Sequence, residues 1–372
     1  MYAQDIDFNN FDFFSGYKII HFHKTIVNYD QMEIFLDKLR SLGIITVMDI
    51  DDHWRPGSHH PAHSLIVSNK LDVKLRDNLK YADYVMTTTE LFANEIRKFN
   101  KNVVVVPNAI DPNERQFIPK PEKSDRVRIG WLGGSSHQYD LELLRGLVNK
   151  VKTAGLIDKV QFVLCGFDTR GVVKQQGPDG KVTERPIKPE ETVWVKYEEI
   201  FTDNYSIVSP EYKEHLQKFV KKDYNSLENE PYRRVWTKPV TSYATNYNLF
   251  DVSLAPIEEN NFNYVKSQLK LIEAGFHKKA VICQNFGPYT IDTVNAFEKG
   301  GTYNYEGNAL LVDTIKNHKQ WFKYVKELIV NDELRTKLSE NLHNTIKDKY
   351  SLQTTASMRA EFYKKILKNK IC

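Results

Sequence analysis

The 372-residue sequence contains little cysteine and no long apolar segment. Its three cysteines (Cys165, Cys283 and Cys372) are too few and too widely separated to form a disulfide framework or a zinc site. No apolar run is long enough to cross a bilayer, and the acidic, aromatic N-terminus lacks the basic and apolar regions of a signal peptide. These absences predict a cytoplasmic protein.

Internal repeats, low-complexity segments and the motifs of several enzyme classes are also missing. The sequence has no G-x-S-x-G element and no cysteine–histidine signature of a hydrolase. It lacks the G-x-G-x-x-G fingerprint as well, so a nicotinamide or flavin cofactor gains little support. No block interleaves aromatic and basic residues in the way that a protein binding single-stranded nucleic acid requires.

Opposite charges are nearly balanced. The chain has 52 lysines and arginines against 48 aspartates and glutamates, which gives a formal net charge of +4 and a pI near 8.6. This excess is well short of the basic stripe of a dedicated nucleic-acid binder. It is compatible with a pocket for an anionic diphosphate and with a weak affinity for acidic lipid surfaces.

Short β-rich runs alternate with helix-length segments in the first part of the chain. Strands are predicted at 17–22, 44–50, 84–88 and 103–106, and helices at 29–42, 70–81 and 89–99. Such alternation predicts a parallel sheet that is covered by helices on both faces.

The alternation restarts after a proline-rich, charged stretch at 111–125. The second series has predicted strands at 127–131, 160–165, 234–237, 252–256 and 279–283, and predicted helices at 140–151, 240–250, 316–330, 332–350 and 352–370. Between about 166 and 231 the regularity lapses. There the sequence predicts a hairpin at 175–188, a strand at Trp194 and a charged helix at 210–222.

This pattern predicts two domains of ordinary size, for which 41% hydrophobic residues supply sufficient core. The predicted divisions are an N-terminal domain (1–115), a hinge linker (116–125), a C-terminal domain (126–350, with the insertion at 166–231) and a C-terminal helix (351–372).

The segment 250–289 carries the clearest indication of function. A buried strand runs into a polar loop and then into a single predicted helix that opens near Asn263. Lys266 and Lys270 are spaced to lie on one helical face, and Glu273 follows three residues later. A strand that leads to a helix N-terminus with cations in its first turns is suited to a phosphorylated ligand, and the carboxylate can accept hydrogen bonds from ribose hydroxyls. The alternative is a solvated helix face with one local ion pair.

A glycine turn closes the first strand of the second series. Gly133 and Gly134 are followed by Ser135 and His137. Glycines allow the backbone to approach a ligand and leave its amide donors unshielded, and serine and histidine can add donors. The alternative is an ordinary tight connection between a strand and a helix.

An acidic turn follows the second strand of the N-terminal domain. Asp51, Asp52 and His53 are interpreted as acceptor-binding or proton-handling residues, with a Mg²⁺ or Mn²⁺ site and a simple capped turn as alternatives. Three further histidines, His59, His60 and His63, surround a proline that breaks the helix a zinc site would need. They are therefore predicted to lie in a loop near the site.

Four blocks together resemble the retaining family 4 glycosyltransferases of the GT-B fold. They are Thr46–Trp54, Val104–Asp111, Arg128–Leu144 and the segment 250–289, and they occur in the family's order across most of the chain. The resemblance implies an α/β GT-B fold, with two Rossmann-like domains whose parallel sheets face a central cleft. It also implies that the C-terminal helix (351–372) braces the N-terminal domain. It also implies a nucleotide-sugar donor such as a UDP- or GDP-sugar, retention of the anomeric configuration, and no metal or other cofactor.

The resemblance assigns roles to residues of this chain. It implies that the donor-binding residues are Gly133, Gly134, Ser135, His137, Asn263, Lys266, Ser267, Lys270 and Glu273. Glu273 matches the second glutamate of the family's E-x7-E motif and would bind ribose. The first glutamate would fall on Val265, so this chain departs from the family in how the donor sugar is held. Asp51, Asp52 and His53 are expected to be the catalytic residues on the acceptor side.

The sequence therefore predicts a glycosyltransferase that moves a sugar to a hydroxyl of a glycan, lipid, protein or modified nucleic acid. No carboxylate is evident near the anomeric carbon, which favours front-face attack over a covalent intermediate. Two alternatives remain open: a nucleotide-sugar epimerase on the same scaffold, and a non-catalytic sugar-nucleotide-binding module, which the missing carboxylate at Val265 favours.

Overall fold

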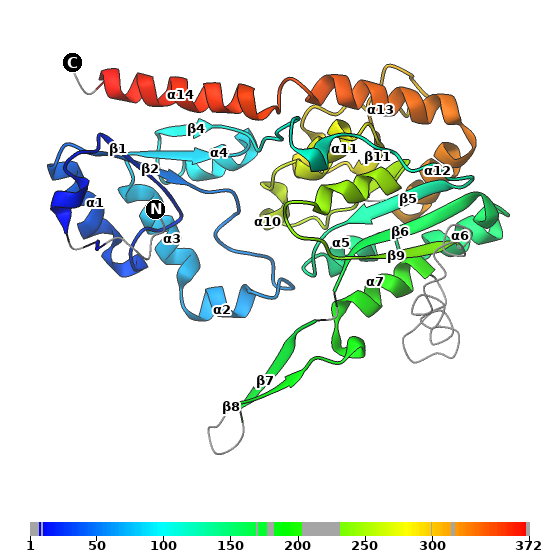
Figure 1. The fold of residues 1–372 in the computed structure, drawn as a ribbon, viewed down its shortest axis with the longest axis horizontal. Coiled ribbons are helices and arrows are strands. Elements are labelled where there is room, and N and C mark those ends of the chain that lie inside the picture. Colours follow the sequence, from blue (N-terminus) through cyan, green and yellow to red (C-terminus); the bar gives the residue numbers. More distant parts are fainter. Residues whose placement is uncertain are drawn as a thin grey trace. The chain divides into compact units, whose positions relative to one another are not determined.

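The computed structural model describes residues 7–8, 10–168, 170–176, 182–202, 231–298, 300–313 and 317–369. The chain divides into two compact units (Figure 1). The first comprises Met1–Ala109, Glu259–Gln268 and Tyr350–Cys372, and the second comprises Ile110–Glu258 and Leu269–Lys349.

The first unit contains a four-stranded parallel sheet in the order β1-β2-β3-β4. Its strands are β1 (Ile19–His23), β2 (Ile45–Asp49), β3 (Tyr84–Thr87) and β4 (Val103–Val105), and its helices include α1 (Met32–Ser41), α2 (His63–Ser68), α3 (Leu71–Tyr81) and α4 (Glu90–Ile96). Thr89 caps α4, because its side chain accepts a hydrogen bond from the backbone N–H of Phe92. The predicted strands and helices of this part are confirmed, while the short helix α2 was not predicted.

The last helix, α14 (Leu352–Asn369), belongs to the first unit. Ile366 is buried in a cluster with Ile45, Val47 and Met86 of the sheet. Side chains four residues apart lie on one face of a helix, so Phe362 also reaches this cluster, with its ring 5.6 Å from that of Tyr84.

The second unit contains a six-stranded sheet in the order β12-β11-β10-β5-β6-β9, all parallel. The strands are β5 (Val127–Leu132), β6 (Val160–Phe167), β9 (Tyr232–Trp236), β10 (Val252–Ala255), β11 (Ala280–Gln284) and β12 (Leu310–Val312). β5 lies next to β10, so the polar segments that follow these two strands leave the sheet at neighbouring points of its carboxyl edge. Ligands of doubly wound sheets bind at this edge.

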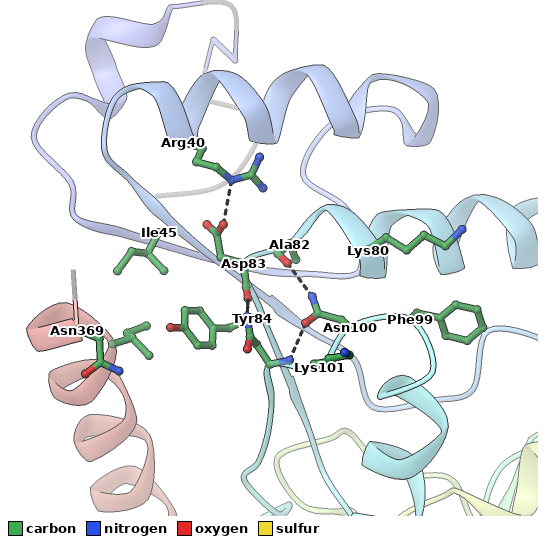
Figure 2. A pocket seen from close by; sticks show the side chains of 12 residues that line it. Arg40, Ile45, Lys80, Ala82, Asp83, Tyr84, Phe99, Asn100, Lys101 and Asn369 are labelled. Atoms are coloured by element: carbon green, nitrogen blue, oxygen red, sulfur yellow. Dashed lines mark hydrogen bonds and ion pairs between the residues drawn. The ribbon is translucent and has the colours of Figure 1, made fainter.

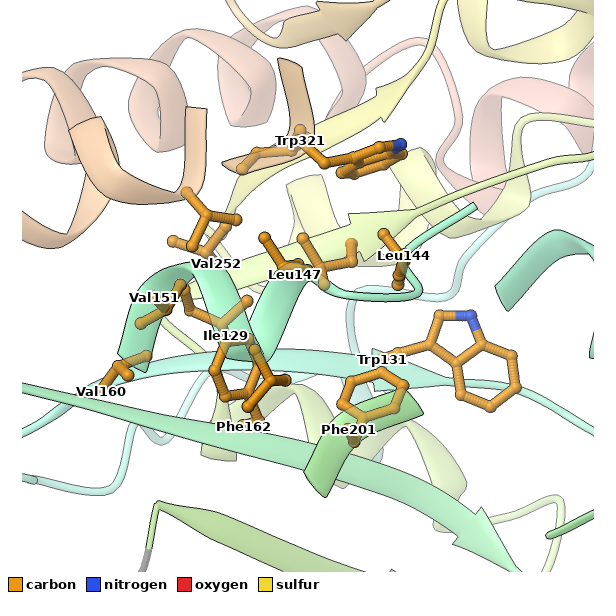
Figure 3. Close-up of a cluster of buried hydrophobic side chains, with 14 of the residues drawn as sticks. Ile129, Trp131, Leu144, Leu147, Val151, Val160, Phe162, Phe201, Val252 and Trp321 are labelled. Atoms are coloured by element: carbon orange, nitrogen blue, oxygen red, sulfur yellow. The ribbon is translucent and has the colours of Figure 1, made fainter. Parts of the chain in front are cut away.

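Helices pack against this sheet, and all of those below except α11 contribute to one apolar core (Figure 3). They are α5 (Gln138–Glu142), α6 (Leu147–Thr153), α7 (Val193–Thr202), α11 (Leu269–Phe276), α12 (Asn317–Val330) and α13 (Asp332–Ile346). Ile129, Leu147 and Phe162 are among the core side chains that Figure 3 shows between the strands and α6. The predicted helix at 140–151 is two helices in the structure, α5 and α6. Gly146 lies between them with a φ of +82°, a backbone conformation that favours glycine.

The insertion contains an antiparallel hairpin, β7 (Val172–Gln176) and β8 (Val182–Pro186), followed by α7. In Figure 1 the hairpin extends away from the six-stranded sheet. The predicted strand at Trp194 is wrong, because this segment is the start of α7. The buried residues Trp194, Tyr197 and Phe201 have helical spacing and cover one face. The predicted charged helix at 210–222 lies outside the described residues.

The single helix predicted from Asn263 to Glu273 is also wrong. The structure has a four-residue helix, α10 (Asn261–Tyr264), then a non-helical stretch before α11. Val265 is 1% exposed in the core of the first unit, and its carbonyl accepts a hydrogen bond from the Thr89 hydroxyl. Tertiary contacts thus override the local helix signal, and Lys266 and Lys270 do not share one helical face.

Two further observations complete the fold. The predicted helix at 240–250 is a 3₁₀ helix, η7 (Tyr243–Leu249). In the part of the chain that the structure describes, no helix is both long and apolar enough to span a membrane.

Candidate functional site

A cavity of about 410 Å³ lies at the carboxyl edge of the six-stranded sheet in the second unit. Three parallel strands deliver residues to it. Gly133, Gly134 and Ser135 follow β5, Gly166 belongs to β6, and Thr237 follows β9. The predicted glycine turn therefore lines a cavity and is not merely a tight connection between a strand and a helix.

Glycine is needed where the loop after β5 approaches the end of β6. The pairing of β6 with β9 shifts register between Cys165 and Phe167, and Gly166 between them has a φ of +101°. A Cβ on Gly166 would lie 2.3 Å from the Gly133 carbonyl oxygen. Gly134 has nothing within 4 Å of a Cβ position, so this side of the residue faces open space.

Lys270 lies beside this loop. Its Nζ donates a hydrogen bond to the Leu132 carbonyl at 2.5 Å and lies 5.1 Å from the centre of the Trp131 ring. A Cβ on Gly133 would be 3.2 Å from the same Nζ. The structure thus brings together a cation and a glycine backbone that are 137 positions apart in the sequence (270 − 133), and this combination can bind an anion.

His137 lies at the end of the glycine loop. Its Nδ1 is 2.6 Å from Oδ2 of Asp140, a buried carboxylate. Its backbone N–H donates to the Tyr197 hydroxyl at 2.9 Å. Asp140 and Tyr197 are functional candidates that sequence reasoning missed, although the three-residue spacing of His137 and Asp140 at a helix start was a usable signal.

The insertion forms another wall of the cavity. Asp168 and Arg170 line it and form an ion pair, with Nε of Arg170 2.9 Å from the carboxylate. Glu191 also lines it and pairs with Arg185 at 2.6 Å. Trp194 also lines the cavity, and one atom of its ring lies 3.3 Å from the Cβ position of Gly166. Sequence reasoning assigned no role to these residues.

Glu273 is more buried than expected. It is 4% exposed, and its carboxylate accepts hydrogen bonds from the hydroxyls of Tyr243 and Tyr247, the latter at 3.0 Å. Burial raises the pKa of Glu273, and the two tyrosine hydroxyls and the charge of Lys270 partly oppose that rise. Burial, together with Glu273, raises the pKa of Tyr243 well above its ordinary value.

Asn263, Lys266 and Ser267 lie in the first unit. Asn263 is buried, and its N–H donates to Oδ1 of Asn260 at 2.8 Å. Ser267 accepts a hydrogen bond from Asn108 at 2.9 Å. Gly133–Ser135 belong to the second unit. That they and Lys266 bind the same donor therefore stays a prediction.

In the acidic turn after β2, the side chains of Asp51 and His53 contact neighbouring residues of the first unit. Asp51 contacts Nε2 of His23 and Nζ of Lys24, each at 3.1 Å. Burial acts to raise the pKa of Asp51, but the contacts with His23 and Lys24 outweigh it and the pKa is lowered. His53 stacks on Trp54, with ring centres 4.2 Å apart, and burial lowers the pKa of His53.

The histidine loop lies beside the segment 259–268 in the first unit. His60 packs against Phe262 with ring centres 5.4 Å apart, and Lys266 lies 4.8 Å from the same ring. Burial and the charge of Lys266 lower the pKa of His60, whereas Asp52 acts in the opposite direction. His63 starts α2, and its Nδ1 is 2.9 Å from the Pro56 carbonyl. Within the described ranges, no three histidine, cysteine, aspartate or glutamate side chains gather closely enough to hold a metal ion.

A larger cavity of about 650 Å³ lies in the first unit (Figure 2), at the amino ends of β2 and β3. Several of its polar groups are already engaged with one another or with the backbone. Asp83 accepts from Nε of Arg40 at 2.9 Å, and Asn100 donates to the Ala82 carbonyl at 2.7 Å. Parallel sheets bind ligands at the opposite edge, so we assign the functional site to the smaller cavity.

Comparison with known proteins identifies the fold. Neither protein-family models nor curated proteins match the sequence. Solved structures do. Sucrose-phosphate synthase from Thermosynechococcus elongatus matches with a TM-score of 0.59 at 13% identity, over 97% of this chain and 77% of that one. The chain has the GT-B fold.

Two further GT-B structures agree. Anabaena HepE in complex with UDP-glucose matches with a TM-score of 0.54 at 11% identity, over 95% of this chain and 80% of that one. A UDP-forming α,α-trehalose-phosphate synthase from Burkholderia xenovorans matches with a TM-score of 0.54 at 12% identity, over 92% of this chain and 72% of that one. The predicted fold and its resemblance to family 4 enzymes are therefore confirmed at the level of structure.

Proposed function

We propose that this chain is a glycosyltransferase that moves a sugar from a nucleoside diphosphate to an acceptor hydroxyl. The observation that carries the proposal is the glycine-lined cavity at the carboxyl edge of the second unit's sheet, with Lys270 held against the loop. The structure of Anabaena HepE, which shares the fold, was solved with UDP-glucose bound. A UDP-sugar is therefore the first donor to test, and a GDP-sugar the second.

In this proposal, the second unit stabilises the departing diphosphate. The ammonium of Lys270 and the backbone amides of Gly134 and Ser135 donate charge-assisted hydrogen bonds to phosphate oxygens, and His137 adds a further donor. The Gly133 amide already donates to the Cys165 carbonyl at 3.4 Å. Negative charge accumulates on the diphosphate as the glycosidic bond breaks, so donors that are already in place lower the barrier.

The ribose is assigned to Glu273, as the resemblance implies. Its carboxylate is occupied by two tyrosines, so a ribose hydroxyl has to take the place of the Tyr243 hydroxyl. The buried Val265 provides no carboxylate for the donor sugar. We assign that contact to Asn263, Lys266 and Ser267.

We assign the acceptor to the turn formed by Asp51, Asp52 and His53. A donor phosphate oxygen takes the acceptor proton during front-face attack, which retains the anomeric configuration without a metal ion. Product stereochemistry from proton NMR tests retention, and activity after treatment with EDTA tests the independence from metal.

The first test exposes the protein to a panel of nucleotide sugars and follows thermal stabilisation and slow hydrolysis of the donor. Lys270→Ala should weaken the binding of UDP by about 10–100-fold, because it removes one charge-assisted contact. Lys326→Ala, on an exposed position of α12, is the matched control and should bind UDP like the wild type. Equal affinities of all three proteins would contradict the assigned site.

The same panel separates the alternatives. An epimerase would interconvert two nucleotide sugars without any acceptor. A non-catalytic binding module would be stabilised by the donor and release no free sugar from it. Hydrolysis that requires Mn²⁺ and is lost in Asp51→Ala would favour a metal-dependent acidic site instead.

A further inference from the structure

A further cavity lies in the first unit, and most of its lining is apolar. Its volume is about 530 Å³, which is within the range of sites for small molecules. The apolar lining residues are Phe8, Phe11, Val27, Ile34 and Phe35. The proposed donor site lies in the second unit, so this cavity is a separate candidate site.

Packed aromatic rings form one wall of this cavity. The ring centre of Phe35 lies 5.4 Å from that of Phe11 and 6.1 Å from that of Phe8. Phe14 is 4% exposed, and its ring centre lies 5.8 Å from that of Phe35. Phe14 and Phe35 both belong to the buried core of the first unit. The aromatic wall is therefore held in place by the core.

Helix α1 contributes another wall. Ile34 and Lys38 are four residues apart, so they lie one above the other on the helix. Ile34 is 75% exposed, although the adjacent Phe35 is buried. Apolar surface of this kind, beside a cavity lined with aromatic rings, favours a ligand that removes it from water.

Lys38 places a positive charge at the cavity. Its Nζ lies 3.9 Å from the centre of the Phe11 ring, which holds the ammonium at the wall. Within the described ranges, no acidic side chain forms an ion pair with Lys38, and the lining of the cavity contains no carboxylate. An ammonium has three N–H donors, and an aromatic ring face leaves them available to an anion.

We propose that this cavity binds a single aliphatic chain that carries an anionic headgroup, either a carboxylate or a phosphate. The chain removes Phe8, Phe11 and Ile34 from water, and the headgroup contacts the ammonium of Lys38. A stable protein partner would need about 800 Å² of contact surface on this side, whereas the cavity has the size of a small-molecule site. The inference does not rest on the proposed function, because it concerns the first unit alone.

The test measures the binding of decanoate, decyl phosphate and decylammonium to the full chain by titration calorimetry, below the concentrations at which they form micelles. These three amphiphiles have the same chain length, so they isolate the effect of the headgroup. Octanoate, which is two methylene groups shorter than decanoate, reports burial of the chain.

The site variants are Lys38→Gln and Ile34→Asn, both at exposed positions of α1. Lys364→Gln, on α14, is the matched control for the charge, and Val73→Asn, on α3, is the matched control for the apolar side chain. Both control positions are exposed, lie in the same unit and do not line the cavity.

We expect the wild type to bind decanoate or decyl phosphate and to bind decylammonium about tenfold more weakly. Each methylene group should tighten binding about fourfold, so decanoate should bind about 15-fold more tightly than octanoate. Lys38→Gln should weaken the binding of the anionic amphiphiles about tenfold and leave that of decylammonium unchanged. Ile34→Asn should weaken the binding of all of them, and the two controls should bind like the wild type.

Three results would overturn the proposal: no binding of either anionic amphiphile, equal binding of decanoate and decylammonium, or equal affinities of Lys38→Gln and Lys364→Gln for decanoate. Sedimentation velocity at two protein concentrations tests the main rival occupant. A dimer that Ile34→Asn dissociates and Val73→Asn does not would show that a second copy of this chain covers the cavity instead.

Discussion

Buried polar side chains in the second unit differ in how they are satisfied. Glu273 accepts hydrogen bonds from the hydroxyls of Tyr243 and Tyr247. His277 is 1% exposed, stacks on the same Tyr247 with ring centres 5.3 Å apart, and has no hydrogen-bond partner for either ring nitrogen among the described residues. An unpartnered buried imidazole is stable only in its neutral form.

Because His277 is buried in its neutral form, we expect the protein to lose stability in acid. Burial lowers the pKa of His277 from 6.5 to about 4. Below pH 6.5 the unfolded chain binds a proton there while the folded protein does not, so the free energy of unfolding falls as the pH drops from 6.5 toward 4. The loss attributable to His277 is about 3 kcal/mol. Urea unfolding at a series of pH values measures it.

His277→Phe is the matched variant, since it retains a ring against Tyr247 and removes the titrating group. Its free energy of unfolding should fall by about 3 kcal/mol less than that of the wild type over the same pH interval. Parallel curves for the two proteins would show that His277 does not carry the acid sensitivity.

The sequence singles out the glycine turn and Lys270 as candidate site residues, the turn because it connects a strand to a helix and Lys270 because it is a cation at the start of a helix. Their partners could not be predicted. The Lys270 contact with Leu132 spans 138 residues, and the Tyr243 contact with Glu273 spans 30. No local pattern encodes such contacts, so the burial of Glu273 appears only once the chain has folded.

At the scale of elements, strands were predicted more securely than helices. Runs of β-branched residues such as Val103–Val105 form strands wherever a neighbouring strand covers them. The helices failed where tertiary contacts intervened. Buried Val265 interrupts one, and the apolar run at Trp194 has the composition of a strand but the spacing of a helix.

The contact between the loop after β5 and the end of β6 is an element-scale feature that one methyl group should disrupt. Gly166→Ala would place its Cβ against the Gly133 carbonyl and force a left-handed backbone on alanine. We expect it to lower the free energy of unfolding by about 2 kcal/mol or more and to weaken the binding of UDP. Gly134→Ala has open space around the new methyl group and should change stability little. Equal stability of the two variants in urea unfolding would contradict this account of the loop contact.

At the scale of the whole molecule, the alternation of strands and helices predicted two domains with parallel sheets, and the resemblance to family 4 glycosyltransferases added the GT-B fold. Neither predicted that the segment after β10 belongs to the first unit. Residues 259–268 lie between β10 and α11 in sequence but belong to the first unit. The C-terminal helix α14, which the sequence analysis expects beside the N-terminal domain, is also in the first unit. Both assignments depend on a few buried contacts, such as those of Val265 and Ile366.

The role of α14 in the first unit is testable with one pair of substitutions. Ile366→Asp would bury a charge against Ile45 and Met86 and should cost about 3–5 kcal/mol of unfolding free energy. Lys365→Asp changes charge at the preceding, exposed position and should cost much less. Thermal and urea unfolding give the comparison, and similar losses in the two variants would mean that α14 does not stabilise the first unit through Ile366.

The central claim is that Lys270 and the backbone of Gly133–Ser135 hold the diphosphate of a nucleotide sugar. A crystal structure of the protein grown with UDP tests it most directly. The account predicts phosphate oxygens within hydrogen-bonding distance of Nζ of Lys270 and of at least one backbone amide of this loop. A UDP molecule bound with its phosphates away from both groups would contradict it.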